Sequence, residues 1–182
     1  FFSKGFPEQG QHLCSQVNEA LLQASEQGRW PIICDMSPCS SQLTEGLDGR
    51  LDLWDSVSFV TRHALAQLAV APTKETISLH IPCSVTRMGQ AEDMTLLAKA
   101  FAEQVVIPAA IACCGFAGDK GFTSPELNQS ALAGLNKQLP VTCLRGVSSS
   151  RTCEIGLPEY SGRPYGSLIT LLDEVSKAPV NR

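Results

Sequence analysis

The sequence feature that most constrains this chain is a pair of adjacent cysteines followed by a run of glycines: Cys113, Cys114, Gly115, Gly118 and Gly121. Glycine lets the backbone bend sharply and approach a bound group closely, so this stretch is not ordinary core. The two cysteines are not expected to pair with each other, because an eight-membered ring across one peptide bond departs from the preferred geometry of a disulfide. The pattern therefore predicts a site at which both cysteines have other partners.

Two further cysteines are candidate partners. Cys83 precedes the adjacent pair in the chain, and Cys153 follows it. Four thiolates brought together form the ligand set that an iron–sulfur cluster or a zinc ion requires. The alternative is that these cysteines are buried as small apolar side chains, since free cysteine is among the most buried residue types. Their clustering favours the metal site, and the burial reading stays open.

The segments around these cysteines resemble a known family. Residues 113–122 read Cys-Cys-Gly-Phe-Ala-Gly-Asp-Lys-Gly-Phe, and residues 150–157 read Ser-Arg-Thr-Cys-Glu-Ile-Gly-Leu. A single cysteine, a Cys-Cys-Gly and a later cysteine motif resemble the cysteine-rich domain of the heterodisulfide reductase B subunit and of glycolate oxidase iron–sulfur subunits. More closely, the two segments resemble the C-terminal end of D-2-hydroxyacid dehydrogenases of the D-lactate type that contain FAD and iron–sulfur centres.

The resemblance implies an iron–sulfur electron-transfer domain of an enzyme that oxidises a D-2-hydroxyacid, with D-lactate and pyruvate as the expected substrate and product. It implies a 4Fe-4S cluster held by Cys83, Cys113, Cys114 and Cys153. It also implies an FAD-binding domain elsewhere in the same polypeptide, so the fragment alone is not expected to be active. In the family the last motif commonly carries Cys-x-x-Cys, whereas here Ser150 stands at its first position. A fifth cysteine ligand is therefore not expected.

The resemblance also implies partners and a location. The electron acceptor would be a quinone or a cytochrome, and the protein would be cytoplasmic or peripheral on the inner face of the cytoplasmic membrane. D-2-hydroxyglutarate and glycolate are alternative substrates, because the substrate pocket is expected in the FAD-binding domain. Two readings of another class stay open: a zinc-stabilised structural or docking module, and a thiol–disulfide redox site.

Residues beside the cysteines can tune such a site. The glycine loop can supply backbone N–H donors to sulfur, and two cations can offset negative charge, although surface lysines are usually only solvated. His80 and Arg87 flank Cys83, where a histidine at a strand end is more often a hydrogen-bonded core residue than a metal ligand. The residues expected to contact the cofactor are Gly115, Gly118, Lys120, Gly121 and Arg151.

Composition excludes some classes of function. The 182 residues carry a formal net charge of −4 and no basic run, so no nucleic-acid partner is expected. Eight cysteines in clusters favour a reducing compartment with metal or redox use over structural disulfides. No apolar run approaches the ~20 residues that a membrane helix needs.

The chain opens at Phe1 without an initiator methionine, which predicts a piece of a larger protein. Exposed apolar surface is then expected around Phe1, Phe2 and Trp54, where the absent part packs.

A similar order of motifs occurs twice. Residues 4–6 and 120–122 both read Lys-Gly-Phe, and each is followed by Pro-Glu, a helical pattern and a strand-like run that ends in cysteine. Helical patterns alternate with short apolar runs, which predicts βα units and mainly parallel strands. We expect an α/β fold of two similar βαβ-rich halves with a pseudo-two-fold duplication. Residues 1–46 would be the remainder of the first half, and residues 47–182 would be the second.

Local patterns predict the individual elements. Cys39 falls in an expected turn over residues 35–39 and would be the counterpart of Cys153, in a half that lacks its other ligands. Asp55 and Ser56 can cap a helix. Within the helix over 90–103, an inward stripe is expected at Met94, Leu97, Ala98 and Phe101. Helices are expected over 9–27, 57–68, 90–103, 126–137 and 167–176, and strands over 30–34, 76–81, 104–107 and 140–143.

Overall fold

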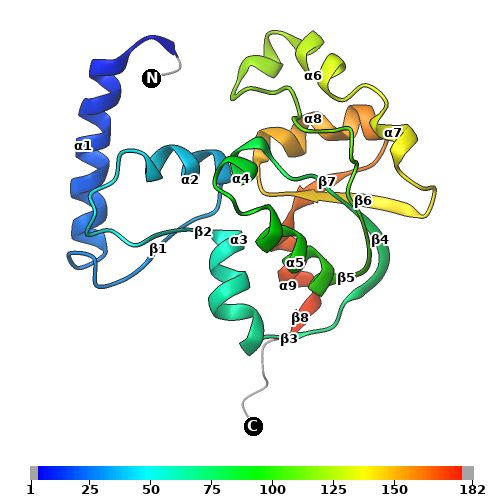
Figure 1. Ribbon diagram of the computed structural model, residues 1–182, viewed down its shortest axis with the longest axis horizontal. Coiled ribbons are helices and arrows are strands. Elements are labelled where there is room, and N and C mark those ends of the chain that lie inside the picture. The colour runs from blue at the N-terminus through cyan, green and yellow to red at the C-terminus, as the bar shows by residue number, and fades with distance from the viewer. Residues whose placement is uncertain (1–3, 178–182) are drawn as a thin grey trace.

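The structure of the protein is a computed structural model that describes residues 4–177 (Figure 1). The expected exposure of Phe1 and Phe2 lies outside the described residues. In chain order the elements are α1 (Pro7–Ala24), β1 (Ile32–Cys34), α2 (Ser37–Thr44), β2 (Leu53–Asp55), α3 (Ser56–Phe59), η2 (Val60–Ala64), η3 (Leu65–Gln67), β3 (Ala69–Val70), β4 (Thr73–Leu79), α4 (Cys83–Arg87), α5 (Ala91–Phe101), β5 (Ala102–Val106), η4 (Lys120–Phe122), α6 (Pro125–Ala131), α7 (Leu135–Gln138), β6 (Cys143–Ser148), α8 (Arg151–Ser161), β7 (Tyr165–Ser167), α9 (Leu168–Val175) and β8 (Ser176–Lys177).

Parallel strands and helices alternate, as the sequence patterns predict. The largest sheet has the strand order β5-β4-β6-β7, and all of its neighbouring strands are parallel. Strands β1 and β2 form a second, parallel pair, and β3 and β8 form an antiparallel one. The α/β class with mainly parallel strands is therefore confirmed.

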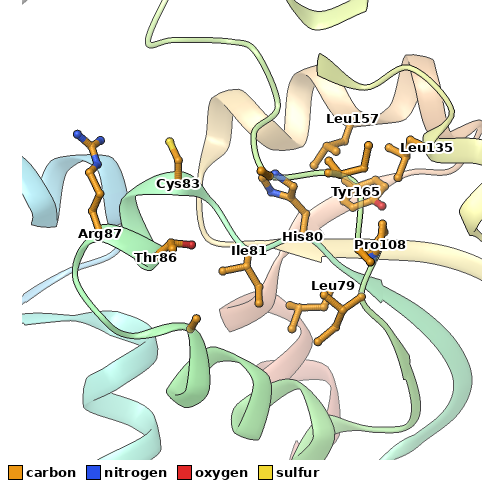
Figure 2. A pocket seen from close by; sticks show the side chains of 15 residues that line it. Leu79, His80, Ile81, Cys83, Thr86, Arg87, Pro108, Leu135, Leu157 and Tyr165 are labelled. Atoms are coloured by element: carbon orange, nitrogen blue, oxygen red, sulfur yellow. The ribbon is translucent and has the colours of Figure 1, made fainter. Parts of the chain in front are cut away.

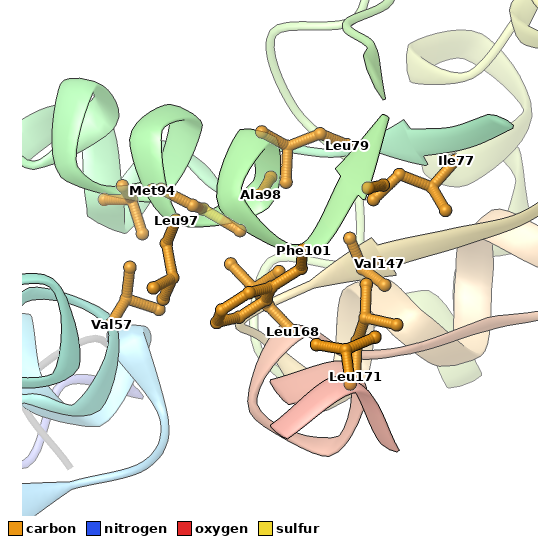
Figure 3. Close-up of a cluster of buried hydrophobic side chains, with 13 residues drawn as sticks. Val57, Ile77, Leu79, Met94, Leu97, Ala98, Phe101, Val147, Leu168 and Leu171 are labelled. Carbon is orange, nitrogen blue, oxygen red and sulfur yellow. The ribbon is translucent and has the colours of Figure 1, made fainter. Parts of the chain in front are cut away.

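Helices cover both faces of the largest sheet. In Figure 1, α5 and α9 lie on one side of it and α7 and α8 on the other. The first side carries the larger core, in which the Phe101 ring lies between α5 and α9 (Figure 3). Met94, Leu97, Ala98 and Phe101 are all fully buried, so the stripe expected on this helix is confirmed. The second side buries a separate cluster that includes Cys114 and Cys153.

Several expected elements are confirmed with small shifts of their ends. The first helix begins at Pro7, a residue that the first turn accepts because its missing N–H would have no partner there. Gly28 follows that helix with a φ of +87°, a conformation that glycine adopts at little cost. The side chain of Asp55 accepts a hydrogen bond from the backbone N–H of Val57 at 3.1 Å and caps α3, as expected.

Other expectations are wrong, and local backbone chemistry explains them. Residues 35–39 do not end in a turn, because α2 begins at Ser37 with Pro38 in its first turn, which makes Cys39 the third helical residue. The helix expected over 126–137 is interrupted at Gly134, whose φ is +80°. The strand expected over 140–143 begins only at its last residue and continues as β6.

One helix was also not predicted, and the predicted exposure of one apolar residue is wrong. Helix α8 was not expected, since its apolar stripe is weak and Pro158 lies inside it. Trp54 is half-buried and not an exposed apolar residue, because its ring packs edge-on against Phe59 and His63 at centroid distances of 6.2 and 4.6 Å. None of the helices formed by residues 4–177 combines the length and the apolar character needed to cross a membrane.

Candidate functional site

Three parallel strands deliver the four candidate cysteines to one rim of the sheet. Cys83 begins α4 shortly after β4 ends, Cys113 and Cys114 lie in the loop that follows β5, and Cys153 lies in the first turn of α8 after β6. Because β4, β5 and β6 are parallel neighbours, their carboxyl ends lie at the same edge. That edge is where open α/β sheets bind their ligands.

Cys114 and Cys153 form the closest pair. Their sulfur atoms lie 2.7 Å apart although 39 positions separate them in the sequence. The distance exceeds the ~2.0 Å of a covalent S–S bond, and all eight cysteines of the chain are free. Both residues are buried. The two sulfur atoms are therefore in direct contact in a water-poor environment.

Cys83 and Cys113 lie beside the first pair. Cys83 is close enough to contribute to the raised pKa of Cys113, and its electrostatic influence reaches Cys153 as well. The backbone N–H of Gly115 donates to Cys113 Sγ at 3.3 Å. All four candidate cysteines thus lie close enough together to affect one another's ionisation.

The pKa values of the thiols differ because of these contacts. The hydrogen bond from the Cys153 thiol lowers the pKa of Cys114 to about 7, and a backbone N–H bond from Phe116 adds to this effect. The same pairing, together with burial, raises the pKa of Cys153. Burial, followed by the neighbouring Cys114 and Cys83, raises the pKa of Cys113. Cys114 is therefore the thiol that most readily becomes a thiolate.

A close packing arrangement holds the Cys-Cys-Gly loop in place. Gly115 has a φ of +73°, and a Cβ there would collide with the carbonyl oxygen of Leu127. Asn128, which is buried, donates its side-chain N–H to the Cys114 carbonyl at 2.8 Å. Gly121 packs against Asn128 and the Phe116 ring with no room for a side chain. Sequence reasoning missed Asn128, and an asparagine in the helix that follows the glycine run is the signal that could have found it.

The other residues expected at the site make no hydrogen bond to a cysteine sulfur within the described part of the chain. Arg151 donates to the buried carboxylate of Glu154 at 3.1 Å, so its charge is paired with a carboxylate. Lys120 is exposed in η4, and Gly118 has a φ of +78° with open space around it. Of the expected cofactor contacts, Gly115 is the one whose N–H is directed at a cysteine sulfur.

Cys39 belongs to a separate place in the structure. Desolvation and then the nearby Cys34 raise the pKa of the Cys39 thiol. Cys34, the last residue of β1, is therefore close to Cys39. Cys39 is the third residue of α2, as Cys153 is the third residue of α8.

His80 is held as a core residue, which was the more favoured sequence interpretation. Its ring is buried, and its Nδ1 lies 3.1 Å from the hydroxyl of Ser148. Burial lowers the pKa of His80 to about 4, so the ring is neutral near pH 7.

The donor set fits a thiolate-bound metal in its chemistry. Four sulfur ligands from three loops at one sheet rim suit iron or zinc, and the N–H groups at Gly115 and Phe116 are hydrogen-bond donors to sulfur of the kind that tunes a cluster. Over the part of the chain that the structure describes, no three His, Cys, Asp or Glu side chains have the spacing of a ready-made metal site. Cys114 and Cys153 are in contact, and Cys83 and Cys113 lie near them.

Comparisons with known proteins add no further assignment. Neither a family model, nor a curated protein, nor a solved structure matches this chain.

Proposed function

We propose that this chain is the iron–sulfur electron-transfer domain of an FAD-linked oxidoreductase that oxidises a D-2-hydroxyacid, with D-lactate to pyruvate as its reaction. The observation that supports it most is the convergence of Cys83, Cys113, Cys114 and Cys153 at the carboxyl edge of parallel strands. The resemblance of the two cysteine motifs to the D-lactate type of dehydrogenase supplies the substrate and the flavin.

The four cysteines would hold a 4Fe-4S cluster, which carries one electron at a time when bound. Backbone N–H groups at Gly115 and Phe116 donate to sulfur and thereby stabilise thiolate charge, which raises the reduction potential of a thiolate-bound centre. Burial of Cys114 and Cys153 keeps water away from two of the ligands. The FAD-binding domain would belong to the same polypeptide, and the acceptor would be a quinone or a cytochrome at the inner face of the cytoplasmic membrane.

We also propose that the chain contains a duplicated unit, present at residues 32–59 and 143–175, so that the first copy extends past residue 46. Support comes from two segments with the same element order, β1-α2-β2-α3 and β6-α8-β7-α9, in which the two strands are parallel neighbours. Cys39 and Cys153 are each the third residue of the first helix. Asp55 and Ser167 each cap the second helix by accepting a hydrogen bond from the backbone N–H two residues later, at 3.1 and 3.2 Å. Such a match in order, cysteine position and cap is expected from a duplicated unit.

Anaerobic reconstitution with ferrous iron and sulfide tests the cluster. We expect uptake of both elements with a visible absorption band, and loss of both in the Cys153→Ser variant. Cys14→Ser is the matched control, because Cys14 lies in α1, away from the four cysteines. Uptake of neither element, or uptake that Cys153→Ser leaves unchanged, would contradict the proposal. Colourless binding of zinc by the same cysteines would favour the structural module instead.

The substrate requires a separate experiment. The complete polypeptide, including its FAD-binding domain, is assayed with D-lactate, D-2-hydroxyglutarate and glycolate and an artificial electron acceptor. We expect the highest kcat/KM with D-lactate. A higher value for another of these acids would reassign the substrate and leave the electron-transfer role in place.

A thiol–disulfide redox site is the second candidate, and the sulfur distance of 2.7 Å between Cys114 and Cys153 favours it. Oxidation of the two thiols would form one S–S bond and transfer two electrons and two protons to an acceptor disulfide, which is cleaved to two thiols. Incubation of the metal-free chain with oxidised glutathione, followed by peptide mass spectrometry, tests it. A Cys114–Cys153 cross-link that reforms after reduction supports this role, and its absence argues against it.

A further inference from the structure

A cavity of about 440 Å³ lies directly beside the cysteine site (Figure 2). Its volume is in the range of small-molecule sites, and most of its wall is apolar. Cys83 lines the cavity and is also one of the four candidate ligands, so a molecule in the cavity would adjoin the cysteine site. The apolar wall includes Leu79, Ile107, Pro108, Leu135, Leu157 and Tyr165.

One buried polar atom in the cavity wall has no partner. His80 is 3% exposed, and its Nε2 has no hydrogen-bond partner within residues 4–177. A buried polar atom left in this way costs free energy, so it points to a group that is bound there. The other polar ring in the wall is already satisfied, because the Tyr165 hydroxyl donates to Ser78 Oγ at 2.7 Å.

The hydrogen bond between His80 Nδ1 and the Ser148 hydroxyl favours one tautomer of His80, because no other acceptor for that hydroxyl lies within the described residues. In the described part of the chain, His80 Nδ1 is the acceptor available to the Ser148 hydroxyl, at 3.1 Å. A neutral ring that accepts at Nδ1 carries its proton on Nε2. In that tautomer His80 presents an uncharged Nε2–H donor to the cavity, away from Thr86 and Arg87 in the same lining, and the ligand atom that matches it is an acceptor.

The wall that the described residues form around His80 offers an anionic ligand no positive charge. His80 is neutral near pH 7, because burial holds its pKa at about 4. The guanidinium of Arg87 lies at the outer end of the site and points away from His80 in Figure 2. A flat apolar ring with a neutral carbonyl oxygen meets both the apolar wall and the His80 Nε2–H donor.

We propose that this cavity binds the ring of a quinone, that a quinone carbonyl oxygen accepts the hydrogen bond from His80 Nε2, and that this quinone is the electron acceptor of the cysteine site. The proposal rests on the proposed electron-transfer function. Oxidation of the hydroxyacid to the oxoacid releases two electrons and two protons. The two electrons pass to the quinone, two protons from solvent water join its two oxygens, and hydroquinone leaves.

Duroquinone is the probe, because methyl groups occupy its four non-carbonyl ring carbons and block the addition of thiols there. Its binding to the 182-residue chain is measured anaerobically by isothermal titration calorimetry, before and after iron–sulfur reconstitution. We expect saturable binding with one site in both states. His80→Phe keeps an aromatic ring and removes the donor, so we expect affinity to fall about tenfold.

A matched pair of variants tests the cavity without touching its buried wall. Ala109 is exposed and lies at the edge of the cavity, whereas Ala110 is exposed and lies outside it. We expect Ala109→Trp to weaken duroquinone binding at least about tenfold and Ala110→Trp to leave it unchanged. Absence of saturable binding, or equal binding by both variants, overturns the quinone site.

The two proposals fail in different ways. Iron and sulfide uptake without duroquinone binding overturns the quinone site and leaves the cluster. Duroquinone binding that depends on Ala109 and His80, in a chain that takes up no iron, overturns the role as electron acceptor, because no centre then supplies electrons.

Discussion

The hydroxyl of Ser37 lies 2.8 Å from the carbonyl oxygen of Ser149, to which it donates a hydrogen bond across 112 positions of sequence. The backbone N–H of Ser37 donates to the same carbonyl at 3.1 Å, and both serines are buried. Ser37 begins α2, and Ser149 lies in the short link that leads into α8 and Cys153. This contact attaches the smaller parallel sheet to the loop that presents a candidate ligand.

Ser37→Ala is expected to destabilise the chain by about 1–2 kcal/mol, because the Ser149 carbonyl and hydroxyl lose a buried partner. Urea unfolding followed by circular dichroism measures the change. Ser15→Ala is the control, since Ser15 is exposed on α1 and bonds only within its own helix. Equal unfolding midpoints for Ser37→Ala and the parent chain would show that this contact carries little free energy.

The glycines of the Cys-Cys-Gly loop are expected to differ in their tolerance of alanine. Gly115→Ala combines a φ of +73° with a collision against the Leu127 carbonyl, and a loss of at least about 2 kcal/mol is expected. Gly118→Ala has a similar φ of +78° but open space around it, and should cost about 1 kcal/mol. Thermal unfolding of the two variants gives the comparison, and a smaller loss for Gly115→Ala would refute the packing argument.

Replacement of Asp55 is expected to lower the free energy of unfolding more than replacement of an exposed carboxylate. Its side chain caps α3 and accepts a hydrogen bond from the Ser40 hydroxyl at 2.8 Å in a buried position. Asp55→Ala should therefore cost about 2 kcal/mol. Asp119→Ala removes an exposed ion pair with Lys4 and should change stability by less than about 0.5 kcal/mol. Both values come from urea unfolding, and a reversed order would contradict the assigned roles.

His80 predicts a specific pH dependence of stability. Its pKa is about 4 in the folded chain and 6.5 in the unfolded chain, so the unfolded state binds the extra proton between these values. The stability contribution of the neutral ring is complete above pH 6.5 and is lost as the pH falls towards 4, with a total on the order of 3 kcal/mol.

Urea unfolding at pH 7 and pH 5 measures this dependence. We expect the loss of stability at pH 5 to be smaller in His80→Phe than in the parent chain, because the variant has no ring to protonate. His12→Gln is the control, since His12 is exposed on α1. A His80→Phe variant with the parent's full pH dependence would show that other groups cause it.

Local patterns in the sequence were sufficient to predict much of the secondary structure. The stripe through Met94, Leu97 and Phe101 identified a buried helix face, because helical periodicity places these residues on one side whatever the rest of the chain does. Asp55 identified a helix start for a similar reason, since its cap is formed with a residue only two positions away. Helix α8 was missed because Pro158 lies inside it, and α2 was missed because Pro38, which is in its first turn, is equally typical of a turn.

The sequence by itself determined the α/β class, the alternation of strands and helices, and the identity of the cysteines that deserve testing, because these depend on residue type and on neighbours within a few positions. Only the tertiary structure decided that Cys114 meets Cys153, that Ser37 meets Ser149, and that His80 faces a cavity beside Cys83. Parallel crossovers bring the ends of β4, β5 and β6 to one edge. Such contacts depend on the order of the strands in the sheet, and that order cannot be predicted from the spacing of residues along the chain.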